Sequence, residues 1–227
     1  MISDNIKRLE EKILNKCSSL GRDRNDIKLI GVTKTQPIEI IRQAVDAGLK
    51  DIGENKAQEL KEKYEKLTNG IKWHFIGHLQ TNKVKYVIKA ADFIHSVDSI
   101  KLAEEINKRA FQIGKRQNVL LEIKTSNEAT KFGLVDEKEI FETAEYCVKS
   151  SNLNLIGLMT IAPFTDNTEL IRKSFIQLRK LKEKLNDSGF HLTELSMGMS
   201  NDFEIAIEEG STMLRIGTAI FGERINN

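Results

Sequence analysis

The strongest constraint on the fold of this chain is an alternation of two sequence patterns that repeats along its 227 residues. Short apolar runs rich in Ile, Leu, Val and Phe are each followed by a longer segment in which apolar residues recur every three or four positions. The short runs predict buried β-strands, and the longer segments predict amphipathic helices. Strands that alternate with helices in this way indicate a parallel sheet with helical crossovers.

The alternation predicts an initial helix followed by eight strand–helix units. The first helix is expected over residues 2–19, and the strands are expected at 27–33, 51–53, 72–76, 93–97, 119–123, 155–159, 192–196 and 212–216. The longer helices are expected from Pro37 to Gly48 and at 55–68, 81–90, 99–114, 136–150 and 167–187, with short helices after Ser200 and after the last strand. Pro37 suits the first turn of its helix, because the N–H that proline lacks has no helical partner there.

Eight such units favour a closed (β/α)8 TIM barrel with an extra N-terminal helix, formed as a single domain over residues 1–227. The alternative is a doubly wound open sheet. That fold needs a switch point in its strand order and usually carries a glycine-rich loop after the first strand. The loop here, Lys34-Thr35-Gln36-Pro37, has no glycine. The barrel is therefore the expected architecture.

The composition argues against several classes of partner. A formal net charge of +2 is too balanced to predict nucleic-acid binding. No segment approaches the roughly 18 apolar residues that a membrane-spanning helix requires, and the charged N-terminus does not resemble a signal peptide. The two cysteines, Cys17 and Cys147, have no CxxC neighbour, so neither a disulfide framework nor a zinc site is expected. We expect a cytoplasmic protein.

In a barrel of this type the functional site lies at the C-terminal ends of the strands. Lys34 follows the first strand directly, so the stem of its side chain would begin in the barrel interior. A lysine in that position can react with carbonyl groups as a free amine. The alternative is a surface lysine that caps the end of the strand.

The loops after the seventh and eighth strands are rich in small residues. They read Gly198-Met199-Ser200-Asn201-Asp202 and Arg215-Ile216-Gly217-Thr218, and each leads into a helix. Free N–H groups and hydroxyls in such loops can hold an anion, and TIM barrels commonly bind phosphate between these two loops. Either loop alone could be an ordinary turn with a capping residue. The presence of both favours a phosphate site.

Arg215 is a charged residue inside an otherwise apolar strand. Because burying an unpaired charge is costly, we expect it to face a ligand or a carboxylate, with a structural ion pair as the alternative. Glu54 is likewise expected in a structural ion pair. His74, His78 and His95 do not have the spacing of a metal site on one helix face. We expect no metal, and His78 is a possible hydrogen-bonding residue of the site.

Six segments of the chain resemble the pyridoxal phosphate homeostasis protein family. They are 32–35 (VTKT), 53–55 (GEN), 73–83 (WHFIGHLQTNK), 157–163 (GLMTIAP), 195–202 (LSMGMSND) and 215–222 (RIGTAIFG). They occur in the family's order and extend from the first expected strand to the eighth. A short motif such as GEN is weak alone, but WHFIGHLQ and SMGMSND together are specific.

The resemblance implies an alanine racemase-like barrel of the fold-type III class that binds pyridoxal 5'-phosphate (PLP). It implies that Lys34 holds PLP as a Schiff base and that Arg215 faces the pyridine nitrogen. Asn55 would line the ring. The phosphate would be held by Ser200, Gly217 and Thr218, and Met197 and His78 would be near neighbours of the ligand.

The role implied is a non-catalytic PLP carrier or buffer, with apo PLP-dependent enzymes as acceptors. A protonated arginine only donates hydrogen bonds, so it would keep the pyridine nitrogen unprotonated and the ring a weak electron sink. The three tyrosines all fall in helical patterns, and the chain ends soon after Thr218, so the tyrosine base of a two-domain racemase is not expected. We expect a monomer. The alternatives are a small amino-acid racemase and a barrel that binds a phosphorylated sugar with an aldolase-type Lys34.

Overall fold

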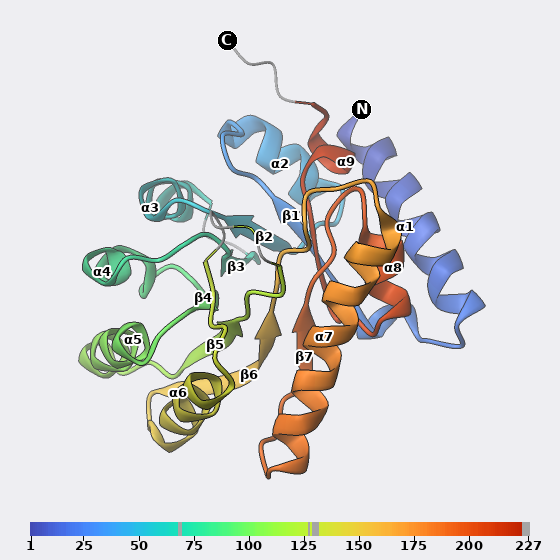
Figure 1. Cartoon of the computed structure of the whole chain (residues 1–227). Helices are drawn as coiled ribbons and strands as arrows, with labels where there is room; N and C mark the ends of the chain where they lie inside the picture. The colour runs from blue at the N-terminus through green and yellow to red at the C-terminus, as the bar shows by residue number, and fades with distance from the viewer. Residues whose placement is uncertain (68–69, 127, 129–131, 224–227) are drawn as a thin grey trace.

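A computed structural model describes residues 1–67, 70–126, 128 and 132–223 of the chain, and its strands form a closed barrel in the order β1-β2-β3-β4-β5-β6-β7-β8 (Figure 1). Every neighbouring pair is parallel, including β1 with β8, which closes the ring. The strands are Lys28–Val32, Asp51–Glu54, Lys72–Phe75, Phe93–Val97, Gln117–Glu122, Leu153–Met159, Glu194–Ser196 and Met213–Ile216. The expected TIM barrel is confirmed, and the open sheet is excluded.

Two strands begin earlier than their apolar runs. β5 and β6 start at Gln117 and Leu153, which are paired with each other at the N-terminal edge of the barrel. Backbone pairing continues there although the residues are partly polar, so an apolar run underestimates the length of the strand. β7 is shorter than expected, because Leu192 and Thr193 precede its first residue, Glu194.

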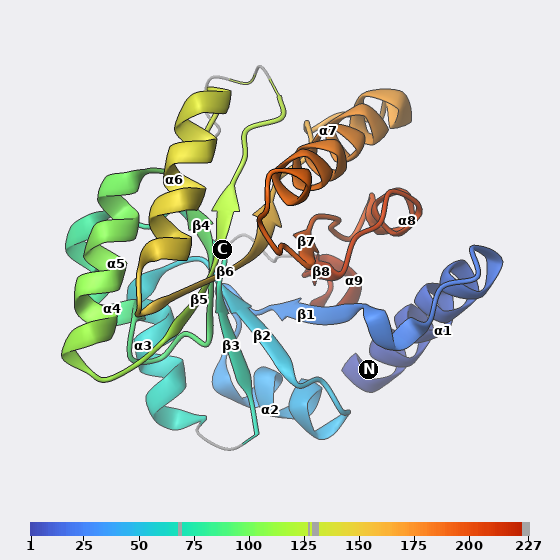
Figure 2. The same ribbon diagram turned by 90° about the horizontal axis from the view of Figure 1, so that it is seen from below.

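The helices follow the expected order around the barrel (Figure 2). They are α1 Ile2–Ser19, α2 Ile38–Asp46, α3 Ala57–Lys66, α4 Val84–Val87, α5 Ile100–Gln112, α6 Glu137–Lys149, α7 Thr168–Asp187, α8 Phe203–Glu208 and α9 Thr218–Phe221. The helix expected over 81–90 is wrong in part: a 3-10 turn, Thr81–Lys83, precedes a single α-helical turn. No side chain caps either piece, so nothing local stabilises a longer helix.

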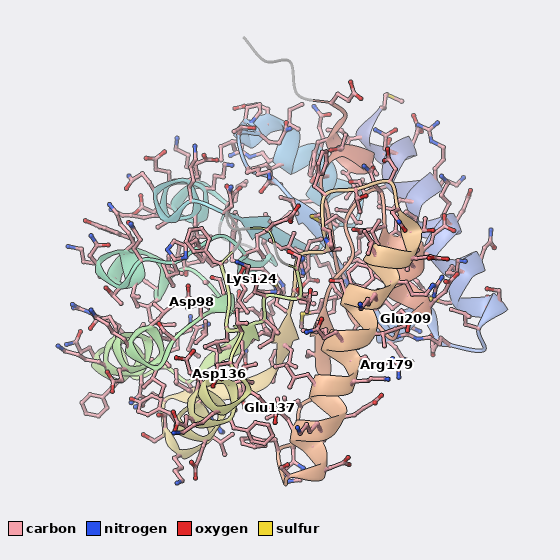
Figure 3. The ribbon with its side chains drawn as sticks, viewed as in Figure 1. Asp98, Lys124, Asp136, Glu137, Arg179 and Glu209 are labelled. Carbon is pink, nitrogen blue, oxygen red and sulfur yellow. The ribbon has the colours of Figure 1, made fainter. Side chains whose placement is uncertain are left out.

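The extra N-terminal helix α1 packs beside α8 and α9 on the outside of the barrel (Figures 1 and 2). Its apolar side, with Ile6, Leu9 and Ile13, is buried against them. Arg179 of α7 lies beside Glu209, which follows α8, and donates a hydrogen bond to it at 3.3 Å (Figure 3). Among the described residues, no helix combines the length and the apolar character that crossing a membrane requires.

The hydrophobic core has two parts. The larger part lies between the strands and the surrounding helices. It includes Trp73 and Phe75, which lie on either side of His74 in β3 and therefore share one face of the strand. The smaller part fills the inside of the barrel with Ile30, Leu120, Met159 and Met213. Because side chains alternate along a strand, residues two positions further along these strands also face the interior. Two of these residues, Glu122 and Arg215, bring charged side chains toward the C-terminal ends of the strands.

Candidate functional site

Lys34 lies in a strained turn directly after β1. The next residue, Thr35, has a φ of 65° and is the one non-glycine residue with a positive φ in the described part of the chain. A β-branched residue is unfavourable there. The N–H of Thr35 donates to Glu59 Oε2 at 2.9 Å, and the N–H of Thr33 donates to the Gly53 carbonyl at 3.0 Å. Both flanks of the half-buried Lys34 are therefore fixed by neighbouring elements.

A buried ion pair supports the same turn. Lys63 Nζ donates to Glu54 Oε1 and to the Thr33 carbonyl oxygen, both at 2.7 Å, and to Glu59 Oε2 at 3.2 Å. Thr33 Oγ1 donates to Glu54 Oε1 at 2.5 Å. Burial raises the pKa of Glu54, and Lys63 and Thr33 act in the opposite direction. The ion pair expected for Glu54 is confirmed. We call Thr33, Glu54, Glu59 and Lys63 the Lys34 clamp.

A row of hydrogen bonds crosses the barrel interior to Arg215. His74 Nε2 lies 2.8 Å from Asp51 Oδ1, and His74 Nδ1 lies 2.8 Å from His95 Nε2. His95 Nδ1 lies 2.9 Å from Ser196 Oγ, which accepts from Arg215 Nη1 at 2.6 Å. We call these five residues the Arg215 chain. All ring nitrogens of its two histidines are engaged within it.

Arg215 is buried and has neutral contact partners. Its Nη1 donates to Ser196 Oγ, and its Nη2 donates to the Thr160 carbonyl oxygen at 2.8 Å. Among the residues that the structure describes, no carboxylate forms an ion pair with it, so the structural ion pair considered for Arg215 is not found. Burial lowers the pKa of Arg215 to about 10, and the charges of Asp202 and Glu122 act in the opposite direction.

Glu122 is a second buried ionisable group at this end of the barrel. It follows Leu120 of the inner core by two positions, so its side chain faces the interior. Burial, followed by the charge of Asp98, raises the pKa of Glu122 to about 7, whereas Arg215 lowers it. Its Oε2 has no hydrogen-bond partner among the described residues. This carboxyl group is therefore available to a ligand.

Asn55 follows β2 and has a similarly unpartnered atom. Its Oδ1 is buried and finds no hydrogen-bond partner in the described residues. Its backbone is held closely by Gly77, because a Cβ at Gly77 would lie only 2.1 Å from the Asn55 carbonyl oxygen. The glycine of the WHFIGH segment therefore has a packing role that positions Asn55.

The two loops expected to bind phosphate lie against each other. Ser200 Oγ, after β7, accepts a hydrogen bond from the N–H of Ala219, after β8, at 3.2 Å. Gly198 turns the first loop with a φ of 96°, and its carbonyl oxygen accepts the Arg215 N–H at 2.9 Å. The second loop also reaches β1, since a Cβ at Gly217 would lie 3.6 Å from Val32 Cβ.

The structure therefore gathers most of the predicted site residues. β8 pairs with β1, so Gly217 and Thr218, which follow β8, lie beside the end of β1 that precedes Lys34. His78 lies further round the barrel, where its Nδ1 is 3.3 Å from Asp98 Oδ2 and its ring stacks on Phe132 at 3.7 Å. Asp98 and Lys124 follow β4 and β5; in Figure 3 Lys124 lies over the barrel, and Asp98 lies at its rim beside β4. Met197 is completely buried in the outer core, and its role beside a ligand stays a prediction.

Comparison with known proteins shows which family the chain belongs to. Residues 5–225 match the alanine racemase N-terminal domain family. The pyridoxal phosphate homeostasis protein of Aquifex aeolicus (strain VF5) is 47% identical over 223 residues, which cover 97% of each chain.

The chain belongs to the pyridoxal phosphate homeostasis protein family. The resemblance expected from the six segments is thereby confirmed. The solved structure of PipY from Synechococcus elongatus PCC7942 with PLP bound is 34% identical and has a TM-score of 0.83 over 92% of this chain and 100% of that chain. Alanine racemase of Clostridium difficile 630 has a TM-score of 0.77 at 19% identity, over 96% of this chain and 57% of the racemase, and supports the fold alone.

Several polar residues of this pyridoxal phosphate homeostasis protein family member were not predicted as part of the site. They are Lys63, Glu122, Thr160 and Ser196, together with the pairing of His74 with His95. Most of them share one signal, a polar side chain at an inward-facing position of a barrel strand. That signal requires the register of the strands, which the sequence pattern gives only approximately. Lys63 lies on a helix and carries no such signal.

Proposed function

We propose that this chain binds PLP as a Schiff base on Lys34 and carries or buffers it without turning over a substrate. The observation that carries the proposal is the arrangement of Lys34, Arg215 and the two joined loops on the adjacent strands β1, β8 and β7. The membership of the family and the PLP-bound relative support the same ligand.

The residues present fit the parts of this cofactor. The amine of Lys34 suits an aldehyde, and the small residues Ser200, Gly217 and Thr218 suit a phosphate group. The unpartnered Oδ1 of Asn55 is a buried polar atom that a ligand can satisfy. Arg215 would face the ring nitrogen, with His78 and Met197 as near neighbours. When bound, PLP supplies a reactive aldehyde and an electron-accepting ring.

Two features support holding PLP rather than turning it over. Arg215 has only N–H donors, so it cannot leave a proton on the ring nitrogen in the way that an acid can. The three tyrosines, Tyr64, Tyr86 and Tyr146, lie in α3, α4 and α6 rather than at strand ends, so none is placed as a second base. Both features argue for a carrier.

The test is spectroscopic. Purified protein titrated with PLP is expected to show the visible absorbance band of a PLP–lysine Schiff base, and Lys34→Ala is expected to lose it. Borohydride reduction followed by mass analysis should place a pyridoxyl group on Lys34. A spectrum without a Lys34-dependent band would overturn the proposal, and a sugar adduct on Lys34 would favour a phosphosugar barrel.

An assay of racemase activity distinguishes the carrier from the alternative, a small amino-acid racemase. Loaded protein is incubated with each L-amino acid, and the D-form is measured against free PLP. Lys34-dependent turnover well above free PLP would favour the enzyme, and its absence supports the carrier.

We further propose that the chain is a cytoplasmic monomer that supplies PLP to apo PLP-dependent enzymes. Light scattering tests the monomer. Reactivation of an apo-enzyme by the loaded protein, compared with reactivation by free PLP at the same concentration, tests the supply.

A further inference from the structure

The Arg215 chain has one consistent direction of hydrogen-bond donation. Arg215 can only donate and an ionised Asp51 can only accept, so the ends fix the links between them. Burial lowers the pKa of His74 and of His95, and a neutral imidazole donates through one nitrogen and accepts through the other. Ser196 therefore accepts from Arg215 and donates to His95 Nδ1, His95 Nε2 donates to His74 Nδ1, and His74 Nε2 donates to Asp51.

This direction matters for the charge of Arg215. Each link of the chain presents its acceptor atom toward Arg215, and aligned hydrogen bonds polarise one another. Partial negative charge is thus placed against the guanidinium by neutral groups. The full negative charge lies at the far end of the Arg215 chain, on Asp51 at the start of β2. The side chain of Asp51 is 21% exposed. A buried cation is stabilised in this way without a contacting carboxylate.

The Arg215 chain is also held firmly in place. The ring of His74 stacks on Phe93 with centroids 4.4 Å apart and an interplanar angle of 8°. Arg215 is fixed on both sides, by Ser196 through Nη1 and by the Thr160 carbonyl oxygen through Nη2. The plane of the guanidinium is therefore set by β7 and by the residue after β6, and no described residue accepts a hydrogen bond from its other side-chain N–H groups.

We infer that Asp51, His74, His95 and Ser196 are positioning residues for the cofactor, which hold Arg215 in the orientation and charge state in which it meets the cofactor ring. This inference rests on the proposed function, because it takes Arg215 as the partner of the ring. A merely structural role would affect stability, but it would not change the spectrum of bound PLP or the tautomers of the histidines in a defined way.

The first experiment uses the ligand-free protein. The protein has four histidines, so His78→Asn and His191→Asn together leave only His74 and His95. Long-range proton–nitrogen NMR spectra of this 15N-labelled variant should show both rings protonated at Nε2 and unprotonated at Nδ1. A proton on Nδ1 of either ring would overturn the direction of hydrogen-bond donation inferred for the Arg215 chain, whether or not the protein binds PLP.

The second experiment measures PLP binding in Asp51→Asn, Ser196→Ala and the double variant. The asparagine side chain would keep an oxygen acceptor for His74, so the first variant removes the charge and preserves the contact. Each single change is expected to raise the dissociation constant for PLP about three- to tenfold, the size of one ordinary hydrogen bond, and to shift the Schiff-base band. Because both residues act through one chain, the double variant should show less than the product of the single effects.

Asp92→Asn is the matched control. Asp92 Oδ2 accepts the N–H of Trp73, and its charge acts on His74, but it does not belong to the chain. Its affinity and its band should equal those of the wild type. If the wild type shows no Lys34-dependent band, the proposed function fails and takes this inference with it. If the wild type shows the band and Asp51→Asn behaves like Asp92→Asn, the inference is overturned and the proposed function stands. Should Ser196→Ala fail to fold, this comparison of the two aspartate variants decides.

Discussion

Lys63 Nζ donates a hydrogen bond to the carbonyl oxygen of Thr33 at 2.7 Å, which joins helix α3 to the residue directly before Lys34. The same ammonium group balances the fully buried Glu54. A single side chain therefore serves both the charge balance of the outer core and the position of the lysine that is proposed to hold PLP. Stability and ligand binding are coupled at this point.

Replacement of Lys63 by methionine should therefore destabilise the protein. It leaves Glu54 buried without a partner, and breaking a buried ion pair costs about 3 kcal/mol or more. The double variant with Glu54→Gln should recover part of that loss, because the buried charge is then removed. Urea unfolding measures both effects. Lys61→Met on the same helix, whose side chain is 47% exposed, is the control and should change stability little.

Glu122 should give the ligand-free protein a distinct dependence on pH. Its pKa in the folded chain is raised to about 7, above the ordinary value that it takes in the unfolded chain. The folded state thus keeps a proton that the unfolded state has already released. The resulting stabilisation is fully present below the unfolded pKa and is lost as pH rises through about 7, with a size on the order of 3 kcal/mol.

The measurement compares the wild type with Glu122→Gln. Free energies of unfolding are determined from about pH 5 to about pH 8, and the difference between the two proteins is plotted. The lowered pKa values of His74 and His95 act in the opposite sense, but both proteins share them, so they cancel in the difference. The wild type should lose stability relative to the variant as pH rises. A difference that stays flat would show that Glu122 does not titrate in this range.

The barrel could be predicted because its cause is local. Each strand is an apolar run and each helix has an apolar side, so the order of the elements can be read from spacing alone. Lys34 and the two small-residue loops could be found in the same way, since they directly follow strands. The one misjudged helix, at 81–90, has no capping residue and only one regular turn, which its apolar spacing did not reveal.

The Arg215 chain and the Lys34 clamp could not be predicted, because their partners are distant in sequence. His95 and Ser196 are 101 positions apart, and Thr33 and Lys63 are 30 positions apart. Their contacts depend on the register of parallel strands and on the rotation of α3, and a shift of one residue would turn each side chain to the opposite face. The sequence indicates that Arg215 is a charge in an apolar strand, but it does not indicate the neutral groups that stabilise that charge.

Gly77→Ala should weaken PLP binding through Asn55. A Cβ at this position would lie 2.1 Å from the Asn55 carbonyl oxygen, so the backbone of one of the two must move. Overpacking of this kind costs about 1–3 kcal/mol. Gly157→Ala is the matched control, because its Cβ would lie 2.0 Å from the carbonyl oxygen of Glu194, the first residue of β7, and not against Asn55. Both variants should lower the free energy of unfolding, but only Gly77→Ala should raise the dissociation constant for PLP. Equal binding by the two variants would remove Asn55 from the site.

Ser200→Ala should discriminate between ligands with and without a phosphate group. Ser200 Oγ accepts the N–H of Ala219 and thereby joins the two loops that are proposed to hold the phosphate. Its loss removes one hydroxyl from that site and releases the contact between the loops, so the affinity for PLP should fall about three- to tenfold. Pyridoxal, which lacks the phosphate, should bind with the same affinity to the variant and to the wild type. Ser188→Ala at the exposed end of α7 controls for the loss of a serine hydroxyl. An equal loss for both ligands would mean that Ser200 acts on the ring or on the fold, and the phosphate would then have to lie elsewhere.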